Sequence, residues 1–258
     1  MKALITGASS GLGRDMARIL SQKGYDLVLV ARRKDRLLEL QKELGGNVEI
    51  LCFDLSKEEN CYALYETVGA IDVLINNAGF GAFGNFLETD LKTEMDMVHV
   101  NACAMHILMK LFLRDFVKRD SGYILNVASA AAFMPGGPLL DVYYASKAYI
   151  LNLTRSVRKE LKKAGSRVSV SALCPGPVKT EFETVAGIDF SSVGMECKKV
   201  ATYAISGMLR KKAVIVPGIA VKLGRFITRF LPDSVLLSAA YVIQAPRQRH
   251  VRKDDMSE

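Results

Sequence analysis

Short apolar runs alternate with longer amphipathic stretches along most of the chain. The runs are short enough for strands and rich in Val, Ile, Leu and Ala, whereas the stretches between them repeat apolar residues at helical spacing. The predicted strands are 3–6, 26–31, 48–53, 73–76, 123–128, 167–173 and 213–216, and the predicted helices are 11–23, 33–44, 57–68, 88–118, 143–164 and 196–210. Strands that are apolar throughout are typical of a parallel sheet with helices on both faces.

No repeat, low-complexity stretch or linker divides the 258 residues. We therefore expect a single Rossmann-type α/β fold, a doubly wound parallel sheet of about seven strands with right-handed crossovers. Residues 1–218 would form the nucleotide-binding and catalytic domain. Residues 219–258 would be a C-terminal helical extension of the same domain, amphipathic and ending in a mobile tail.

Charge and cysteine content narrow the class of protein. Five scattered cysteines, with no Cys-x-x-Cys pair, predict no metal site and are typical of reduced thiols in a cytoplasmic protein. The net charge of +8 is concentrated between residues 196 and 231, but the lack of tryptophan and of clustered aromatics there does not favour nucleic-acid binding. We find no leader-like segment and no apolar run of about 18 residues, so we expect no targeting extension and no membrane span.

The extension carries an apolar stripe at helical spacing, formed by Ile219, Leu223, Phe226, Ile227, Phe230 and Leu231. Lys222, Arg225 and Arg229 fall on the opposite face, and a second apolar stripe follows Pro232. One interpretation is a peripheral contact with an anionic membrane. The other is a helix that packs over a substrate cleft or against another subunit.

A glycine-rich segment joins the first predicted strand to the first helix and reads Thr6-Gly7-Ala8-Ser9-Ser10-Gly11-Leu12-Gly13. Such a loop brings a pyrophosphate to a helix N-terminus, where free N–H groups and the helix dipole favour anions. The second strand ends at Ala31-Arg32-Arg33 instead of the acidic residue typical of NAD sites. We therefore predict NADP(H), with Arg32 as the 2′-phosphate ligand and Ser9 and Arg33 assisting. Alternatively, one or both arginines are simply solvent-exposed side chains at the start of a helix.

Further motifs resemble the short-chain dehydrogenase/reductase family over nearly the whole chain. The matching residues are the segment 6–13, Asn76-Asn77-Ala78-Gly79, Asn101, Ser129, Tyr143 with Lys147 in a Tyr-x-x-x-Lys pattern, and Pro175-Gly176-Pro177-Val178 followed by Thr180. The resemblance implies a seven-stranded sheet, NAD(P)(H) and reversible reduction of a carbonyl group. It also implies a homodimer or homotetramer that pairs the helices 88–118 and 143–164.

The resemblance makes Asn101, Ser129, Tyr143 and Lys147 the catalytic residues. Tyr143 and Lys147 are four apart on a predicted helix and so share one face. A nearby ammonium and an oxidised nicotinamide would lower the tyrosine pKa towards working pH, so that Tyr143 exchanges a proton with the substrate oxygen. Ser129 would hydrogen-bond that oxygen. By resemblance, Lys147 also holds the nicotinamide ribose and Asn101 anchors a water.

Combining the glycine loop with the resemblance gives the predicted cofactor contacts. They are Gly7, Ser9, Ser10, Gly11, Leu12, Gly13, Arg32, Arg33, Asp54, Leu55, Asn77, Ala78, Gly79, Tyr143, Lys147, Pro175, Gly176, Val178 and Thr180. By resemblance, Asp54 and Leu55 meet the adenine, and Val178 and Thr180 meet the carboxamide. Asn76 and Asn77 could equally be structural links between strands.

The sequence thus predicts an NADP(H)-dependent oxidoreductase that moves a hydride between nicotinamide and a small-molecule carbonyl or alcohol. The expected pocket residues Phe80, Phe133, Met134, Leu139, Leu140 and Phe182 are all apolar, which favours a lipophilic substrate unless several belong to the core. A redox-sensing protein with little turnover is an alternative, but its usual mark is loss of Tyr143 or Lys147. A peripheral-membrane protein is another.

Overall fold

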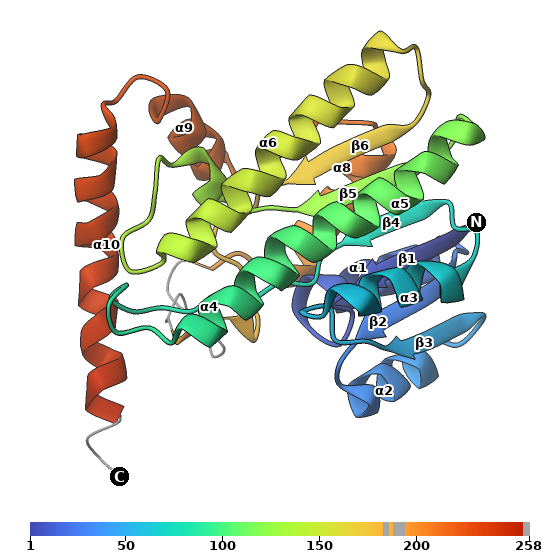
Figure 1. Cartoon of the computed structure of the whole chain (residues 1–258), viewed down its shortest axis with the longest axis horizontal. Coiled ribbons are helices and arrows are strands. Elements are labelled where there is room, and N and C mark those ends of the chain that lie inside the picture. Colours follow the sequence, from blue (N-terminus) through green and yellow to red (C-terminus); the bar gives the residue numbers. More distant parts are fainter. Residues whose placement is uncertain (183–185, 188–193, 255–258) are drawn as a thin grey trace.

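The structure is a computed structural model that describes residues 1–182, 186–187 and 194–254. Its centre is a seven-stranded parallel sheet in the order β3-β2-β1-β4-β5-β6-β7 (Figure 1). The strands are β1 (Lys2–Thr6), β2 (Asp26–Ala31), β3 (Val48–Cys52), β4 (Val73–Asn76), β5 (Tyr123–Val127), β6 (Ser169–Leu173) and β7 (Val214–Ile215). The predicted doubly wound fold is confirmed, although β7 has two residues where four were predicted.

Helices follow the strands as predicted, with ends that differ by a few residues. They are α1 (Gly11–Gln22), α2 (Lys34–Leu44), α3 (Glu58–Val68), α4 (Leu91–Val98), α5 (Met105–Lys118), α6 (Asp141–Lys163), α8 (Cys197–Leu209), α9 (Ile219–Ile227) and α10 (Asp233–Asp254). A π-helical segment η1 (His99–Ala104) joins α4 to α5, and a 3-10 turn η2 (Ala130–Phe133) precedes α6. The expected end of the mobile tail, 255–258, lies outside the described residues.

Apolar side chains fill both sides of the sheet because neighbouring strand residues point to opposite faces. Ala3 and Ile5 of β1 pack with α1, α2 and α8, whereas Leu4 packs with α3, α5 and α6 (Figure 1). Each face is therefore covered by helices, and the carboxyl ends of the strands remain free to shape a site.

The helix that runs through α4, η1 and α5 is the most apolar long helix among the described residues. Residues Leu91–Lys118 include an 18-residue window with a mean hydropathy of 1.2, long and apolar enough to cross a membrane by length and composition. Leu108, Met109, Phe112 and Phe116 of this helix are buried against the sheet. Packing in the core therefore accounts for its apolar character.

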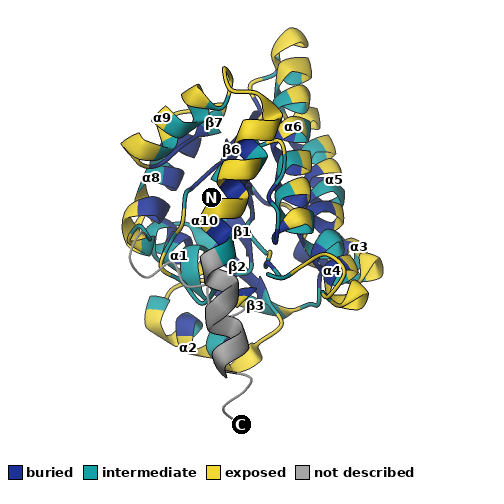
Figure 2. Cartoon of the chain, turned by 90° about the vertical axis from the view of Figure 1, so that its left-hand side faces the viewer, coloured by how far each residue is buried: buried dark blue, intermediate teal, exposed yellow. Residues whose placement is uncertain are grey.

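The two C-terminal helices lie beside the carboxyl end of the sheet (Figure 1). α10 is anchored by Leu236 and Ala240, which are buried. The predicted amphipathic helix α9 forms, but it turns its apolar stripe outward, with Ile219 84% and Phe226 58% exposed (Figure 2). Arg225 turns towards the protein, 5.0 Å from the ring centroid of Phe133, whereas Lys222 and Arg229 are exposed.

Candidate active site

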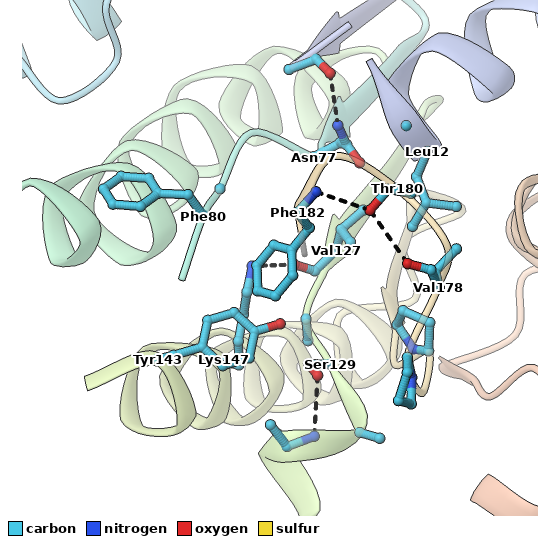
Figure 3. Close-up of a pocket in the computed structure, with 18 of the residues that line it drawn as sticks. Leu12, Asn77, Phe80, Val127, Ser129, Tyr143, Lys147, Val178, Thr180 and Phe182 are labelled. Carbon is cyan, nitrogen blue, oxygen red and sulfur yellow. Dashed lines mark hydrogen bonds between the residues drawn. The ribbon is translucent and has the colours of Figure 1, made fainter. Parts of the chain in front are cut away.

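A cavity of about 810 Å³ opens at the carboxyl ends of β1 to β6, between α6, α9 and α10 (Figure 3). Its volume is typical of a pocket for a small molecule. The predicted cofactor and catalytic residues line this cavity, except Gly13 and Asn101, which pack against lining residues. The fold therefore brings together residues that are up to 173 positions apart, from Gly7 to Thr180.

The glycine loop needs glycine at two positions for steric reasons. Gly7 has a φ of +66°, in the left-handed region that glycine favours. A Cβ on Gly13 would lie 2.3 Å from the carbonyl oxygen of Gly7, so only glycine allows this close approach. The loop then leads into α1 at Gly11, whose first N–H groups can receive a phosphate.

Asn77 holds this loop against β4. Its Nδ2 donates to the carbonyl oxygens of Thr6 at 3.0 Å and Gly7 at 3.1 Å (Figure 3). The Thr6 hydroxyl in turn accepts from the backbone N–H groups of Asn77 and Ala78, both at 3.0 Å. Asn76 is buried and donates to Asn126 Oδ1 of β5 at 3.0 Å. The structure therefore supports the structural interpretation for Asn76 and shows the same kind of link for Asn77.

Arg33 at the end of β2 faces the glycine loop. Its Nη2 donates to the hydroxyls of Ser9 at 3.1 Å and Ser10 at 3.0 Å. Its Nη1 forms an ion pair of 2.9 Å with Glu181, which Arg36 of α2 also contacts. Hydrogen bonds from Arg36 and Arg33, together with the charge of these two arginines, lower the pKa of the Glu181 carboxyl below its usual value. Arg33, Ser9 and Ser10 thus form a cluster of anion-binding groups at the cavity wall.

Arg32 lies at the same wall and, like Arg33, is exposed. It is near Asp54, whose carboxyl accepts hydrogen bonds from the backbone and hydroxyl of Ser56. Burial acts to raise the pKa of Asp54, but the Ser56 hydrogen bonds and the charge of Arg32 outweigh it and lower that pKa. Arg32 therefore contributes positive potential next to the place where the sequence predicts the adenine.

Tyr143 and Lys147 project from one face of α6 into the cavity, towards Ser129 at the end of β5 (Figure 3). The Lys147 ammonium lies 5.8 Å from the Tyr143 ring centroid and donates to the carbonyl oxygen of Val127 at 3.0 Å. The Ser129 hydroxyl accepts from the N–H of Ala131 at 3.2 Å, which fixes its position. A phenol, an ammonium and a hydroxyl thus converge on one point.

Burial sets the proton affinities of these groups. It raises the pKa of Tyr143 to about 12, against a hydrogen bond with Ser129 that lowers it. It lowers the pKa of Lys147 to about 8. In the chain by itself, desolvation disfavours the phenolate, and the predicted lowering of the phenol pKa beside an oxidised nicotinamide stays a prediction. At neutral pH, Tyr143 is a protonated phenol and can donate a proton.

Asn101 lies in η1, where the helix widens to π geometry, a feature frequent at functional sites. Its Oδ1 accepts from the N–H of Phe80 at 3.0 Å, and its Nδ2 donates to the carbonyl oxygen of Phe80 at 2.9 Å and to Ser146 at 3.2 Å. A Cβ on Gly79 would lie 2.7 Å from Asn101 Oδ1 and 3.1 Å from Lys147 Nζ. Asn101 is therefore packed between the β4 loop and α6, next to Lys147.

Apolar residues line the rest of the cavity, mostly as predicted. Phe80, Phe133, Met134, Leu140 and Phe182 line it, and the rings of Phe182 and Tyr143 have centroids 5.3 Å apart. Leu139 is the exception, because a φ of +70° turns its buried side chain elsewhere. The C-terminal extension also lines the cavity, in agreement with the interpretation of a helix over a cleft, through residues that the sequence analysis did not name: Ala220, Val221, Gly224, Arg225, Thr228, Ala239, Ala240, Ile243 and Gln244. Their helical spacing was visible, but not the direction in which they face.

Known proteins share this arrangement. A family model described as short chain dehydrogenase matches residues 1–188. The chain belongs to the short-chain dehydrogenase family. It is therefore an oxidoreductase that acts on carbonyl and alcohol groups and uses a nicotinamide cofactor. The matched residues end before α9 and α10.

Three relatives illustrate the similarity. An uncharacterized oxidoreductase of Staphylococcus epidermidis is 30% identical over 225 residues, which cover 85% of this chain and 96% of the relative. A short-chain dehydrogenase from Sphingobium yanoikuyae, solved with NADPH, is 31% identical with a TM-score of 0.78, covering 90% of this chain and 96% of that one. A short chain dehydrogenase/reductase from Burkholderia phymatum, solved with NAD, is 25% identical with a TM-score of 0.80, covering 87% and 91%.

Proposed function

We propose that this chain is an NADP(H)-dependent oxidoreductase that interconverts lipophilic carbonyl compounds and their alcohols. The observation that carries the cofactor choice is the cluster of Arg33, Ser9 and Ser10 at the end of β2, where a guanidinium and two hydroxyls suit a phosphate. Arg32 adds positive potential at the same wall. The similar Sphingobium structure holds NADPH, which agrees with this choice.

The residues present fit a dinucleotide along the whole cavity. Gly7, Ser10, Gly11, Leu12 and Gly13 would hold the pyrophosphate at the start of α1. Asp54, Leu55, Ala78 and Gly79 would meet the adenosine, and Pro175, Gly176, Val178 and Thr180 the nicotinamide end. When bound, the reduced cofactor supplies the hydride that reduces the substrate carbonyl carbon.

The catalytic groups of the chain would handle the proton. In the direction of reduction, the Ser129 hydroxyl donates a hydrogen bond to the substrate oxygen and orients it. The Tyr143 phenol, protonated at neutral pH, then donates its proton to the alkoxide that develops on that oxygen. Lys147 stabilises the resulting phenolate by its charge and would also bond the nicotinamide ribose. Asn101 would support Lys147 from behind through its contacts with Phe80 and Ser146.

The substrate class follows from the walls beside Tyr143. Phe80, Phe133, Met134, Leu140 and Phe182 are apolar, and the C-terminal helices add further alanine, valine and isoleucine side chains. Measuring NADPH and NADH oxidation with aldehydes, quinones, steroids and 3-oxoacyl compounds tests the proposal. We expect turnover with apolar ketones and a clear preference for NADPH. Equal kcat/KM for the two cofactors would refute the NADP(H) assignment, and no turnover with any carbonyl would refute the reaction.

A second proposal concerns where the enzyme works. Its five cysteines are unpaired in the structure, which favours the cytoplasm. The outward stripe of α9 and the segment after it, with Leu223, Phe226 and Phe230 more than half exposed, supports a peripheral contact with an anionic membrane. Basic residues near this stripe would add about 1 kcal/mol per charge near the lipid surface.

Co-sedimentation with vesicles of phosphatidylglycerol tests this contact. We expect the full chain to bind at low salt, and the double variant Phe226→Ser/Phe230→Ser to lose binding. Leu87→Ser is the matched control, because Leu87 is 90% exposed but lies far along the chain from α9. If the full chain ignores these vesicles, the stripe does not serve as a membrane contact.

A further inference from the structure

Two arginines meet at one aromatic ring in the wall of the cavity. The guanidinium carbon of Arg225 in α9 lies 5.0 Å from the ring centroid of Phe133, and that of Arg155 in α6 lies 5.9 Å from it. Arg225 and Phe133 both line the cavity. Arg225 is half-buried, so its side chain is accessible to a ligand. The two side chains therefore place two positive charges beside a largely apolar part of the wall.

No carboxylate neutralises these two charges within the part of the chain that the structure describes. Neither Arg155 nor Arg225 takes part in an ion pair there. Burial and then the charge of Arg225 lower the pKa of Arg155. The two cations therefore repel each other, and an anion bound beside them would offset that repulsion.

Arg225 lies near the reacting end of the cavity. Phe133 is the last residue of η2, four positions after Ser129. Val221 lies one turn before Arg225 on α9, and a Cβ on Gly176 would be 2.8 Å from its Cγ2. Gly176 belongs to the nicotinamide end of the proposed cofactor site. The arginine cluster at the end of β2 is four strands away from β6, which precedes Gly176, so the two cationic groups serve different parts of the cavity.

We propose that Arg225 binds an acidic group of the substrate, with Arg155 adding positive potential. The planar guanidinium can donate paired hydrogen bonds to a carboxylate or a phosphate. Phe133 and Met134 would contact the hydrocarbon part. The substrate class is therefore an otherwise apolar ketone that carries an acidic group, and the product is the corresponding hydroxy acid or hydroxy phosphate. This inference rests on the proposed function, in which Tyr143 marks the reacting end.

Matched pairs of ketones test this anchor. One series pairs keto acids with their methyl esters, and a second pairs the phosphate monoesters of hydroxy ketones with the free hydroxy ketones. The length between the carbonyl and the acidic group varies within each series. We expect at least one pair in which the acidic member has a kcat/KM about tenfold higher, as a charge-assisted hydrogen bond in a partly exposed site allows. A preference in either series supports the anchor, and the series that shows it identifies the acidic group.

Substitutions of Arg225 show whether its charge causes the preference. Arg225→Met removes the charge and should bring the ratio within the pair close to one, whereas Arg225→Lys should keep part of it. Lys222→Met is the matched control, because Lys222 lies on the same helix and is exposed but does not line the cavity. This control loses the same charge and should keep the full ratio. Arg225→Gln replaces Arg225→Met if a thermal melt shows that the methionine variant does not fold.

A purely structural role for Arg225 predicts a different result. If the guanidinium only packs on Phe133, Arg225→Met changes both members of every pair equally, and the ratio stays as it was. That outcome overturns the anchor, as does a wild-type enzyme without preference in any pair. Loss of NADPH binding in Arg225→Met would also overturn it, since Arg225 would then serve the cofactor.

Calorimetric binding of the same pairs in the presence of NADP⁺ separates this inference from the reaction itself. Preferential binding of an acidic ketone that Arg225→Met abolishes supports the anchor even without turnover, and equal binding overturns it. Absence of NADPH oxidation with preferential binding intact would count against the proposed reaction alone.

Discussion

Arg33 is the single residue with the most direct consequence for cofactor choice. Its guanidinium contacts the hydroxyls of Ser9 and Ser10, although Arg33 and Arg32 are both exposed. Arg33→Ala should lower kcat/KM for NADPH about 10–150-fold, the effect of losing a charge-assisted hydrogen bond of about 1.5–3 kcal/mol, and change that for NADH little. Arg32→Ala, the matched control, should have the smaller effect. A larger effect of Arg32→Ala would contradict this expectation and favour Arg32 as the 2′-phosphate ligand, as the sequence analysis predicted.

The lowered pKa of Lys147 has a consequence for stability. Its pKa is about 8 in the folded chain, against about 10.4 in an unfolded one. Between these values the unfolded state binds more protons at this residue, so the free energy of unfolding should rise with pH across that window. Urea unfolding at pH values of about 7.5 and 9.5 measures the rise. Lys147→Met should reduce it, whereas Lys118→Met, at an 80% exposed side chain, should leave it intact.

The site residues could be predicted from the sequence where they belong to a motif of a few consecutive residues. The glycine loop and the Tyr143–Lys147 pair are read within eight residues of sequence, and both lie where the prediction placed them. The raised pKa of Tyr143 was not predictable, because it depends on burial by distant elements. The contact of Arg33 with Glu181 was not predictable either, since the two residues lie 148 positions apart.

At the scale of elements, the loop after β6 is tied to α2 by Glu181. The ion pair of Glu181 with Arg33 would compete with the proposed 2′-phosphate for the same guanidinium. Exposed ion pairs contribute about 0.2–1 kcal/mol each. Glu181→Gln should therefore tighten NADPH binding about 1.4- to fivefold and leave the Kd for NADH nearly constant, measured by fluorescence titration.

Glu43→Gln is the matched control for this substitution. Glu43 pairs with Arg18 in a similar exposed position, but neither residue lines the cavity. Weaker NADPH binding in Glu181→Gln would show that Glu181 supports the phosphate site and does not compete with it.

The spacing of apolar residues predicted each helix named in the fold. It could not show the π-helical segment within the 88–118 helix or the direction in which α9 faces. The 88–118 helix begins at Leu91, because Asp90 caps it by accepting from the N–H of Thr93 at 2.9 Å. The π segment that holds Asn101 leaves the apolar spacing almost unchanged, so it was not visible. In α9, Arg225 lies 5.0 Å from the ring centroid of Phe133, 92 positions earlier in the chain, a contact that spacing along the helix could not show.

At the scale of the whole molecule, the fold was predictable because strands buried on both faces admit few topologies. The outer side of the α5–α6 layer leads to a prediction about assembly. Val117 of α5 and Tyr149 of α6 are exposed there, and the family pairs these helices between subunits. Light scattering at micromolar protein should give two or four times the chain mass of 28.3 kDa. A mass of one chain would contradict the predicted oligomer.

The central claim is that Tyr143 protonates a carbonyl oxygen as NADPH delivers its hydride. Single-turnover oxidation of NADPH with an apolar ketone tests it most directly in wild type, Tyr143→Phe and Tyr149→Phe. Tyr149 is the control, since it lies on the exposed side of α6 and bonds His106 at 2.7 Å. We predict that Tyr143→Phe lowers the rate by about 10²–10⁴ with NADPH binding retained, as loss of a general acid does, and that Tyr149→Phe does not. A Tyr143→Phe enzyme that reduces the ketone at the wild-type rate would contradict the account.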